Sequence, residues 1–367
     1  MAFQNHGLTK LGLIAFGTSI LYFLISRHTR CEESTAKAKI IRLSNKILHS
    51  HNDPRVDIIR HAQGDTFMTL QLDQTEFIRA PAKWCGGNDT QGTFNISSTL
   101  RTCFPEIVIS DNLTVKKSLR LMRDTLALSG IRYAMTFGSF LGSLRYHGRM
   151  PFDCDFDLLV HWKDHKRALQ ALLQLASDPT SQMRVIDLTP AGANAKVGLA
   201  CGRSTLWMNP DNWTEFGSSV TFDNGIPTGY SWKPFLKMTK SCEIYVDIYA
   251  NAHDYFVLGR SSEPQPIYRP LEGTLFRIFE GARGFLEDHY GVSLDMCMPK
   301  TPLMVRGQFK HLPRNCPQLM VACTTLDALY PRVFKFEVAN PPALYEVGLK
   351  LDKEGKCWIH SVFLIRS

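Results

Sequence analysis

Apolar residues recur along the chain in patterns that predict both helices and strands, separated by short polar turns. Apolar positions at helical spacing predict helices over residues 36–49, 115–129 and 164–175. Short apolar runs predict strands over 133–137, 158–160, 184–188 and 242–250, and a hairpin formed by 345–351 and 358–365. Apart from the first of these helices, the segment from 31 to about 110 is polar and mixed, and the organisation tightens around residue 111.

Residues 138–157 interrupt this pattern with a concentration of chemically active side chains, GSFLGSLRYHGRMPFDCDFD. In a strand, residues two apart point to the same face, so Asp153, Asp155 and Asp157 are expected to share one. Neighbouring carboxylates repel one another, and Mg²⁺ takes carboxylate and phosphate oxygens as ligands. A solvated acidic edge is the simpler interpretation of an isolated D-x-D pair, but the Gly-Ser turn and the flanking strands favour a metal site.

The pair Gly138-Ser139 is expected at the turn from strand to helix. Gly138 lacks a Cβ atom, which lets a ligand phosphate approach the backbone closely. Ser139 offers a hydroxyl and a backbone N–H at a helix start, where anions are favoured. The nucleotidyltransferase fold has this order of elements: a strand, a Gly-Ser turn, a helix, and then D-x-D leading into a second strand. This predicts the α+β class, with a mixed sheet flanked by helices.

A further carboxylate lies in the predicted strand 242–250, CEIYVDIYA. Its aliphatic residues alternate onto one face, which leaves Asp247 on the other face with Tyr245 and Tyr249. A carboxylate in such a strand needs a partner. In the nucleotidyltransferase fold a neighbouring strand supplies the third metal ligand, which makes Asp247 the candidate. Pairing with a lysine or with backbone groups is the alternative.

The stretch 138–157 resembles the signature of the LicD family, which includes fukutin and fukutin-related protein. The matching positions are Gly138, Ser139, Gly142, Arg145, Gly148, Pro151, Asp153, Asp155 and Asp157. The departures are Tyr146 at the histidine position, with His147 one place later, Phe152 at the tryptophan position, and Cys154 between the first two aspartates. Asp247 matches a similar strand of the family. The segment 267–291 resembles a later part of the pattern, with His289 expected to be structural.

This resemblance implies metal-dependent transfer of a phospho-alcohol, such as ribitol phosphate or phosphocholine, from a CDP-linked donor to a glycan on a glycoprotein or glycolipid, with release of CMP. Asp155, Asp157 and Asp247 are then the expected ligands of Mg²⁺ or Mn²⁺. Asp153 is expected to be a further ligand or a general base.

Several other residues are expected to contact the donor. Gly138 and Ser139 are expected to cradle its phosphates. Arg145, Arg149 and Lys233 are candidates for its diphosphate, with a solvent-facing role as the alternative for each.

Composition fits a globular protein with a sizeable core. Of 367 residues, 44% are hydrophobic and 21% are charged. The net charge of +8 suits an anionic substrate or a membrane surface. No basic run is interleaved with aromatic residues, so a nucleic acid is not an expected partner.

The N-terminal segment carries an apolar run over residues 11–25, with Lys10 before it and Arg27 and Arg30 after it. No small-residue cleavage site follows. We therefore expect a signal anchor over 11–26, a cytoplasmic tail over 1–10, and the remainder in the lumen of the Golgi or ER as a single-pass type II protein. A cleaved signal peptide is the alternative. The basic residues after the run favour the opposite orientation.

Sequons and cysteines favour a lumenal location. Sequons begin at Asn88, Asn95, Asn112 and Asn212, and the chain has ten cysteines. Candidate disulfides are Cys85 with Cys103 and pairs among Cys297, Cys316 and Cys323, with buried free thiols as the alternative.

The expected domain order is a stem over 27–110, a catalytic domain over 111–330, and a C-terminal hairpin over 331–367 docked on that domain. Three rival functions share these features. A Golgi glycosyltransferase also uses D-x-D, a metal and an anchor. An enzyme of the same fold would transfer the nucleotide itself. A catalytically inactive protein would only bind a glycan or a partner.

Overall fold

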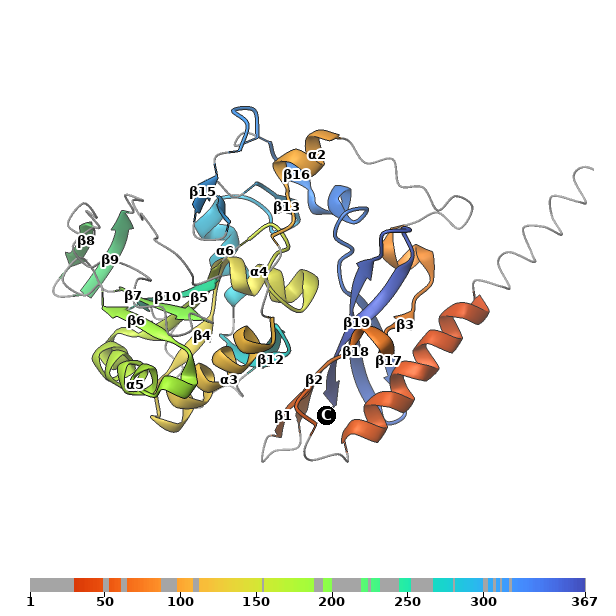
Figure 1. The fold of residues 1–367 in the computed structure, drawn as a ribbon, viewed down its shortest axis with the longest axis horizontal. Coiled ribbons are helices and arrows are strands. Elements are labelled where there is room, and N and C mark those ends of the chain that lie inside the picture. Colours follow the sequence, from red (N-terminus) through yellow and green to blue (C-terminus); the bar gives the residue numbers. More distant parts are fainter. Residues whose placement is uncertain are drawn as a thin grey trace, which may run out of the picture.

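The computed structural model describes residues 30–48, 53–60, 65–86, 98–107, 112–153, 155–187, 194–199, 219–223, 226–231, 244–251, 267–279, 281–299, 303–305, 308–310, 312–316 and 319–366. Helices and strands are mixed along the chain, which confirms the predicted α+β class. Two larger sheets organise the described residues (Figure 1). The predicted span over 11–26 lies outside these residues. Among the described helices, none is long and apolar enough to cross a membrane.

The first sheet, here called the central sheet, has the strand order β4-β5-β10-β7-β6. Its strands are β4 (Tyr133–Met135), β5 (Asp155–His161), β10 (Ile244–Asn251), β7 (Asn194–Leu199) and β6 (Arg184–Asp187). β5 and β10 run parallel, whereas the other neighbouring pairs are antiparallel. The sheet is therefore mixed, as predicted.

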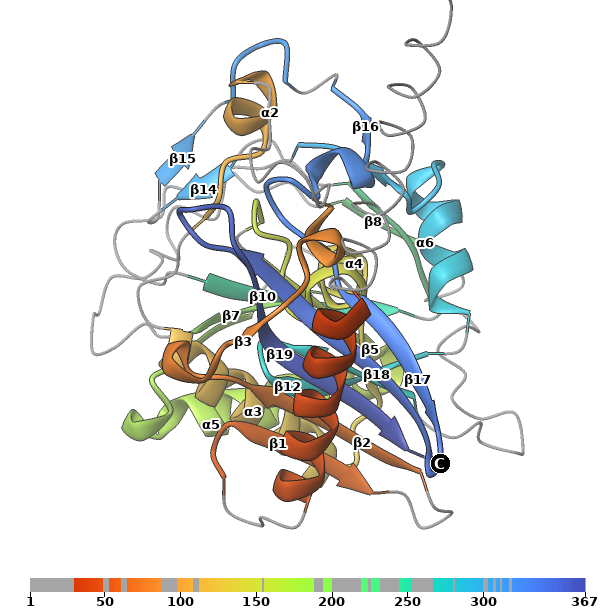
Figure 2. The ribbon, with the colours of Figure 1, turned by 90° about the vertical axis from the view of Figure 1, so that its right-hand side faces the viewer.

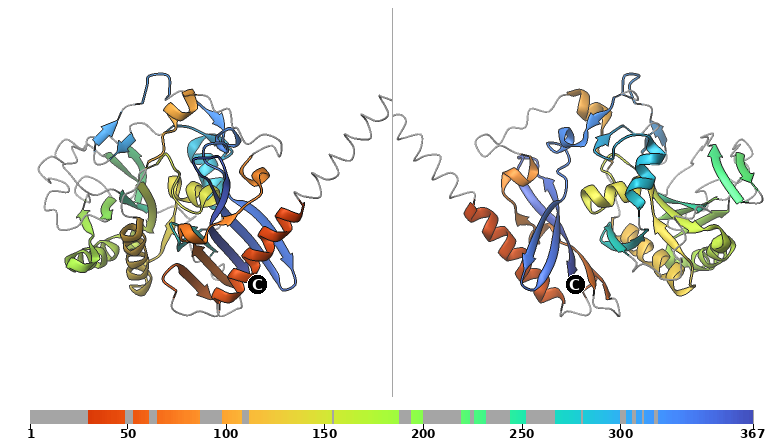
Figure 3. Two further views of the ribbon diagram at one scale, coloured as in Figure 1. Left: turned by 45° about the vertical axis from the view of Figure 1, so that its right-hand side comes forward. Right: turned by 180° about the vertical axis from the view of Figure 1, so that it is seen from behind.

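Helices flank the central sheet on both sides. These are α3 (Asn112–Leu128), α4 (Phe137–Tyr146), α5 (His165–Ser177) and α6 (Ala282–Tyr290). α3 and α5 lie side by side, and α4 and α6 lie on the opposite side of the sheet from them (Figures 1 and 3). Phe156, Leu158, Val246 and Ile248 are almost fully buried beneath them. The alternation in β5 thus turns its apolar side chains to the core, as the sequence predicted.

The second sheet, here called the accessory sheet, has the order β1-β2-β19-β18-β17, and β3 pairs with β19. Its strands are β1 (Val56–Arg60), β2 (Thr66–Gln71), β3 (Ile78–Arg79), β17 (Phe334–Ala339), β18 (Pro342–Leu351) and β19 (Cys357–Arg366). β18 and β19 form the predicted C-terminal hairpin. The parts of the chain before residue 86 and after residue 333 thus share one sheet.

The helix over residues 30–48 covers one face of the accessory sheet (Figure 2). Its buried residues Ala36, Ile40 and Ile47 join a core with Met68 and Val362 of the sheet. The sequence predicted this helix over 36–49, and helical residues are described from residue 30 onward.

Smaller elements complete the fold. The short pairs are β11 (Ile267–Leu271) with β12 (Thr274–Ile278), β13 (Met296–Cys297) with β16 (Val321–Ala322), β14 (Leu303–Val305) with β15 (Gln308–Lys310), and β8 (Ser219–Asp223) with β9 (Ile226–Ser231). The remaining helices are α2 (Ser98–Cys103) and the 3-10 turns η1 (Gln74–Glu76), η2 (Ala82–Cys85), η3 (Trp162–Asp164), η4 (Pro179–Ser181) and η8 (Cys323–Leu326).

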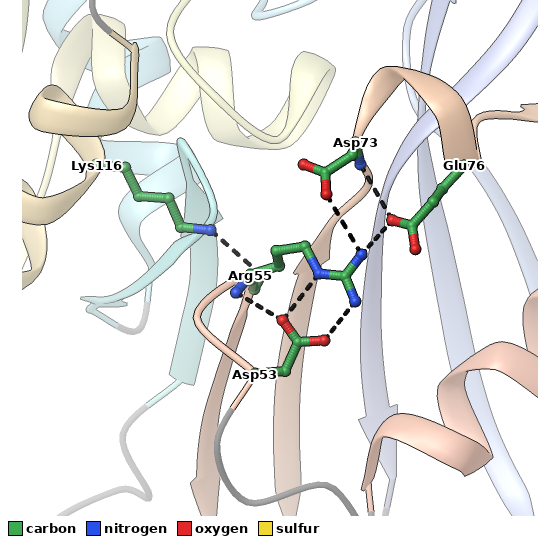
Figure 4. A network of polar contacts seen from close by, with 5 residues as sticks. All are labelled: Asp53, Arg55, Asp73, Glu76 and Lys116. Carbon is green, nitrogen blue, oxygen red and sulfur yellow. Dashed lines mark hydrogen bonds and ion pairs between the residues drawn. The ribbon is translucent and has the colours of Figure 1, made fainter.

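Buried polar contacts join the accessory sheet to α3 and β12. The Asp57 carboxylate on β1 accepts hydrogen bonds from Arg123 on α3 and from the backbone N–H of Leu275, the latter at 2.7 Å. Nearby, Lys116 Nζ donates to the backbone carbonyl of Arg55 at 3.3 Å. The Arg55 side chain in turn contacts the carboxylates of Asp53, Asp73 and Glu76 (Figure 4).

Three disulfides staple the described residues, Cys85–Cys357, Cys103–Cys316 and Cys297–Cys323. The predicted pairing of Cys85 with Cys103 is wrong, because β19 brings Cys357 next to Cys85 and residues 312–316 bring Cys316 next to Cys103. Cys297–Cys323 confirms one of the predicted pairs. Disulfides persist in oxidising compartments, which favours folding in the secretory pathway.

Candidate active site

The start of α4 is tied to β5 by the residues around the Gly-Ser pair. The backbone N–H of Thr136 donates to the carbonyl of Asp157 at 3.1 Å. In the reverse direction, the N–H of Asp157 donates to the hydroxyl Oγ of Ser139 at 2.7 Å. Two bonds therefore fix the turn against the strand that carries the aspartates.

Gly138 lies directly beneath two carboxylates. A Cβ atom added at this position would stand 2.8 Å from Asp153 Oδ2 and 3.3 Å from Asp157 Oδ2. Any larger residue would displace these oxygens. The close approach that glycine permits here is therefore to the protein's own carboxylates. The structure brings Asp153 and Asp157 together at the Gly-Ser turn, as the motif spacing predicted.

These carboxylates are shielded from solvent. The exposed fractions of Asp153, Asp155 and Asp157 are 3%, 7% and 7%. Burying charged carboxylates is costly unless they are hydrogen-bonded, paired or bound to a metal. A cation bound beside these carboxylates would offset part of this desolvation cost.

The neighbouring strand β10 places Asp247 beside Asp157. In the parallel register, Asp247 pairs with Asp157 and Tyr245 pairs with Asp155. Paired residues on neighbouring strands lie on the same face of a sheet. The backbone therefore puts Asp247 at the register position required of a third ligand. Its side chain lies outside the described atoms.

The described residues fit a divalent cation in their chemistry. Two carboxylate oxygens border one point above Gly138, and hard oxygen ligands of this kind suit Mg²⁺. Within the described side chains, no group of three His, Cys, Asp or Glu residues is arranged around one point. A divalent cation bound here would need Asp247 or oxygens of a ligand as further donors.

Arg145 is directed to backbone carbonyls. Its guanidinium donates to the carbonyls of Leu294 and Met296, and Nη1 lies 3.6 Å from the sulfur of Met150. Burial lowers the pKa of Arg145. These contacts join α4 to the residues after α6. A role of Arg145 in binding a diphosphate stays a prediction.

Arg149 organises the loop that precedes the aspartates. Its Nη1 donates to the carbonyl of Asp153 at 2.6 Å, and its Nη2 donates to the carbonyl of Ile107. Its backbone N–H donates to Glu272 at 3.0 Å. Arg149 thus holds Asp153 through the backbone, while contact with a diphosphate stays a prediction. Lys233 and Cys154 lie outside the described residues.

Gly142 lets this loop cross α4. A Cβ atom at Gly142 would stand 2.3 Å from the carbonyl oxygen of Gly148 and 2.7 Å from the nitrogen of Met150. No side chain fits between the helix and the loop. The second glycine of the motif is therefore required by backbone packing.

Phe152 and Tyr146, two departures from the expected pattern, are both buried. Phe152 packs edge-on against Phe104 at 5.1 Å and near Tyr330 at 6.0 Å, beside the Cys103–Cys316 disulfide. Burial raises the pKa of Tyr146 to about 12, so this phenol stays protonated at neutral pH. Both side chains thus support the loop from the interior.

A buried ionic cluster ties the same loop to the accessory sheet. The Glu346 carboxylate on β18 accepts bonds from Arg269 Nη1 at 2.9 Å, Arg269 Nη2 at 2.7 Å and Lys335 Nζ at 2.6 Å. His147, the C-cap residue of α4, places Nε2 3.4 Å from Glu346 and Nδ1 3.1 Å from Ser361 Oγ. The loop from His147 to Asp153 is therefore anchored at its start on β18 and β19.

Burial and hydrogen bonding shift the pKa values of Glu346 and His147 in this cluster. Burial favours the neutral form of Glu346, but its bonds from His147 and Arg269 hold the pKa of its carboxyl well below the usual range. Burial lowers the pKa of His147, which favours the neutral imidazole. Sequence reasoning missed this cluster. The available signal was a lone glutamate in the apolar strand 345–351, because a buried charge requires a partner.

The parallel pair β5 and β10 carries Asp157 and Asp247 at matching register, which is the arrangement predicted for a nucleotidyltransferase-type domain. A sequence model of the LicD/FKTN/FKRP nucleotidyltransferase domain matches residues 130–199. This part of the chain is therefore similar to that domain, which favours a transferase. The match includes Gly138 and the three alternating aspartates and ends before Asp247. A comparison with curated proteins found no match.

Proposed function

We propose that this protein transfers a phospho-alcohol, such as ribitol phosphate or phosphocholine, from a CDP-linked donor to a glycan on a glycoprotein or glycolipid. The observation that carries the proposal is the convergence of Asp153 and Asp157 above Gly138, inside a matched LicD-type domain. Phosphoryl-type transfer depends chiefly on positioning and on neutralising phosphate charge. A cluster of buried carboxylates beside a helix start suits both tasks.

The reaction balances without a further co-reactant. A hydroxyl oxygen of the acceptor glycan bonds to the phosphorus that carries the alcohol. The bond from that phosphorus to the bridging oxygen breaks, and CMP leaves with the electron pair. The hydroxyl proton passes to a base, for which the Asp153 carboxylate is the proposed acceptor.

The chain's own groups have separable proposed roles. Asp155, Asp157 and Asp247 would hold Mg²⁺ or Mn²⁺, which supplies neutralisation of charge on the phosphate oxygens. Backbone N–H groups at Gly138 and Ser139 would orient the donor phosphates. Arg149 keeps Asp153 in place through its backbone carbonyl. Burial of the site would exclude water, which otherwise competes with the acceptor hydroxyl.

The proposed location is the lumen of the Golgi or ER, with a type II anchor formed by residues 11–26. The three disulfides support an oxidising compartment. Protease protection of the chain in sealed microsomes tests the orientation, because a lumenal domain is protected until detergent is added.

A donor screen tests the function. The full chain in detergent is incubated with Mg²⁺, a glycan mixture and CDP-ribitol, CDP-choline, CDP-glycerol, CDP-ethanolamine or UDP-sugars, and released nucleotide is quantified. We expect CMP from one CDP-alcohol, abolished in Asp155→Asn and Asp157→Asn. The matched control is Asp295→Asn, whose side chain is 78% exposed. Release of UDP from a UDP-sugar would instead favour a glycosyltransferase, and attachment of CMP to the acceptor would favour nucleotide transfer.

A metal-binding titration separates an enzyme from an inactive relative. We expect Mn²⁺ to bind the full chain and to bind Asp157→Asn at least tenfold more weakly. The substitution replaces a charged carboxylate, one of the proposed oxygen donors to the metal, with a neutral amide. Equal affinity of Asp157→Asn and the native chain would contradict the metal site.

A further inference from the structure

Four aromatic rings from three elements meet beside the Gly-Ser turn. Phe137 begins α4, Tyr249 lies on β10, and Phe285 and His289 lie on α6. The ring of Phe137 is 5.5 Å from that of Tyr249, 6.1 Å from that of Phe285 and 4.8 Å from that of His289. Phe137 is therefore the centre of this aromatic cluster.

The cluster borders the carboxylates. Phe137 directly precedes Gly138, which lies beneath Asp153 and Asp157. Tyr249 follows Asp247 by two residues and so occupies the same face of β10. A ligand whose phosphates reached Gly138 would thus have the rest of its body within reach of these rings.

Phe137 holds a conformation that bulky residues avoid. Its backbone φ is +43°, in the left-handed region where non-glycine residues are uncommon. Such backbone strain is found most often at ligand-binding and catalytic sites. Asparagine or glycine would adopt this turn more easily, so the presence of a phenyl ring here points to a use for the ring.

The buried side chains of α6 are Ala282 and Leu286 and do not include His289, whose ring also lies 5.1 Å from that of Tyr290. Phe279 contacts Phe285 at 5.5 Å, and together they explain how α6 is fixed to the core. His289 is exposed, yet its ring lies nearly parallel to that of Phe285, 6.1 Å away with an angle of 18°. Partial burial lowers the pKa of His289, which favours the uncharged imidazole at neutral pH. An exposed, flat and neutral ring at the rim of an aromatic cluster suits stacking on another flat group.

We propose that this aromatic cluster is the subsite for the nucleobase of the donor, with the base stacked against His289 and Phe137. The inference rests on the proposed function, since it assumes a nucleoside diphosphate donor, and adds where its base lies. Stacking of a base on an aromatic side chain contributes about 1–3 kcal/mol, or about 5- to 150-fold in affinity. The carboxylate region then binds the phosphates and the cluster selects for a nucleoside.

The test compares a ligand that has a base with one that has none. Dissociation constants of CDP and of pyrophosphate, each with Mg²⁺, are measured by calorimetry on the full chain in detergent. For His289→Ala we expect CDP to bind about tenfold more weakly and pyrophosphate to bind unchanged. His289→Phe restores CDP binding because it keeps a flat ring. Asp288→Ala, an exposed neighbour on the same helix, is the matched control and leaves both affinities unchanged.

The outcomes separate this inference from the proposed function. Unchanged CDP affinity in His289→Ala overturns the base subsite while leaving nucleotide binding in place. An equal loss for CDP and pyrophosphate also overturns it, because the effect would then be structural. A native chain that binds neither ligand overturns both proposals.

Discussion

Glu346 and Arg269 form a two-pronged ion pair in the interior, between the accessory sheet and the strand β11. Both guanidinium nitrogens donate to the carboxylate, and the Glu346 side chain is 1% exposed. A third bond, from Arg269 Nη2, reaches the carbonyl of Ser143 on α4 at 3.3 Å. The pair therefore connects the accessory sheet to the helix that carries the Gly-Ser turn.

Replacing Glu346 by Gln is expected to destabilise the protein strongly. Removing one partner of a buried ion pair leaves an uncompensated charge and costs about 3–5 kcal/mol. The free energy of unfolding from urea titration measures this. Glu354→Gln is the matched control, since the Glu354 side chain is 69% exposed and is expected to change stability by less than about 1 kcal/mol. Equal effects of the two variants would contradict the assignment.

Stability is expected to fall as the pH drops below about 6.5. Burial lowers the pKa of His360 to about 3, and burial also lowers the pKa of His147. In the unfolded chain a histidine takes up its proton near pH 6.5. Between these pH values the unfolded state binds more protons, so each such group reduces stability by about 1.4 kcal/mol per pH unit. Above pH 6.5 these histidines contribute no slope.

Urea titrations from pH 8 to pH 4 check this expectation. In His360→Gln the slope between pH 6 and pH 4 is expected to be shallower than in the native chain. The Gln side chain keeps a polar group opposite Gln71, whose Nε2 lies 3.4 Å from His360 Nδ1. An unchanged slope would show that other groups control the acid sensitivity.

Gly142→Ala is expected to reduce both stability and transfer activity. The added methyl group would meet the backbone of Gly148 and Met150, and overpacking of this kind costs about 1–3 kcal/mol. The displaced loop also carries Arg149, which holds Asp153. Gly284→Ala on α6 is the matched control, because a Cβ atom there meets nothing within 4 Å. That control is expected to gain up to about 1 kcal/mol from helix propensity.

The disulfides are expected to differ in their contribution to stability. Cys85–Cys357 closes a separation of 272 residues, and Cys297–Cys323 one of 26 residues. In the chain-entropy account the longer loop contributes about 5.6 kcal/mol and the shorter one about 3.5 kcal/mol. Paired serine variants of each disulfide, compared by urea unfolding, measure the difference. All four cysteines are similarly buried, so side-chain transfer affects both variants alike.

Local features of the site could be predicted from the sequence, whereas its distant supports could not. The alternation of Asp153, Asp155 and Asp157 and the turn at Gly138 depend on neighbours within twenty residues, and periodicity captures such contacts. Pairing of β2 with β19 depends on residues from opposite ends of the sequence. No local pattern encodes that pairing, which is why Cys85 was assigned to the wrong partner.

The contacts of Arg145 and Arg149 could not be predicted from the sequence either. Arg145 and Arg149 occur among phosphate-binding candidates in the sequence, yet the hydrogen bonds of their guanidinium groups to oxygen go to backbone carbonyls. A long charged side chain reaches many acceptors, and only the surrounding loops decide which one. Glu346 is the reverse case. A glutamate in an apolar strand indicates that a buried partner is needed, but the sequence does not indicate that this partner is Arg269.

Strand β2 is synthesised long before its partner β19. At about 5–20 residues per second, the 272 residues between Cys85 and Cys357 take roughly 15–50 s to translate. During that interval one edge of β2 and the thiol of Cys85 have been made, but their partners have not. The accessory sheet is therefore completed after residues 130–199, the part similar to the nucleotidyltransferase domain, have been synthesised. Until then, the unpaired edge of β2 and the Cys85 thiol are the points at which chaperones and disulfide isomerases would act.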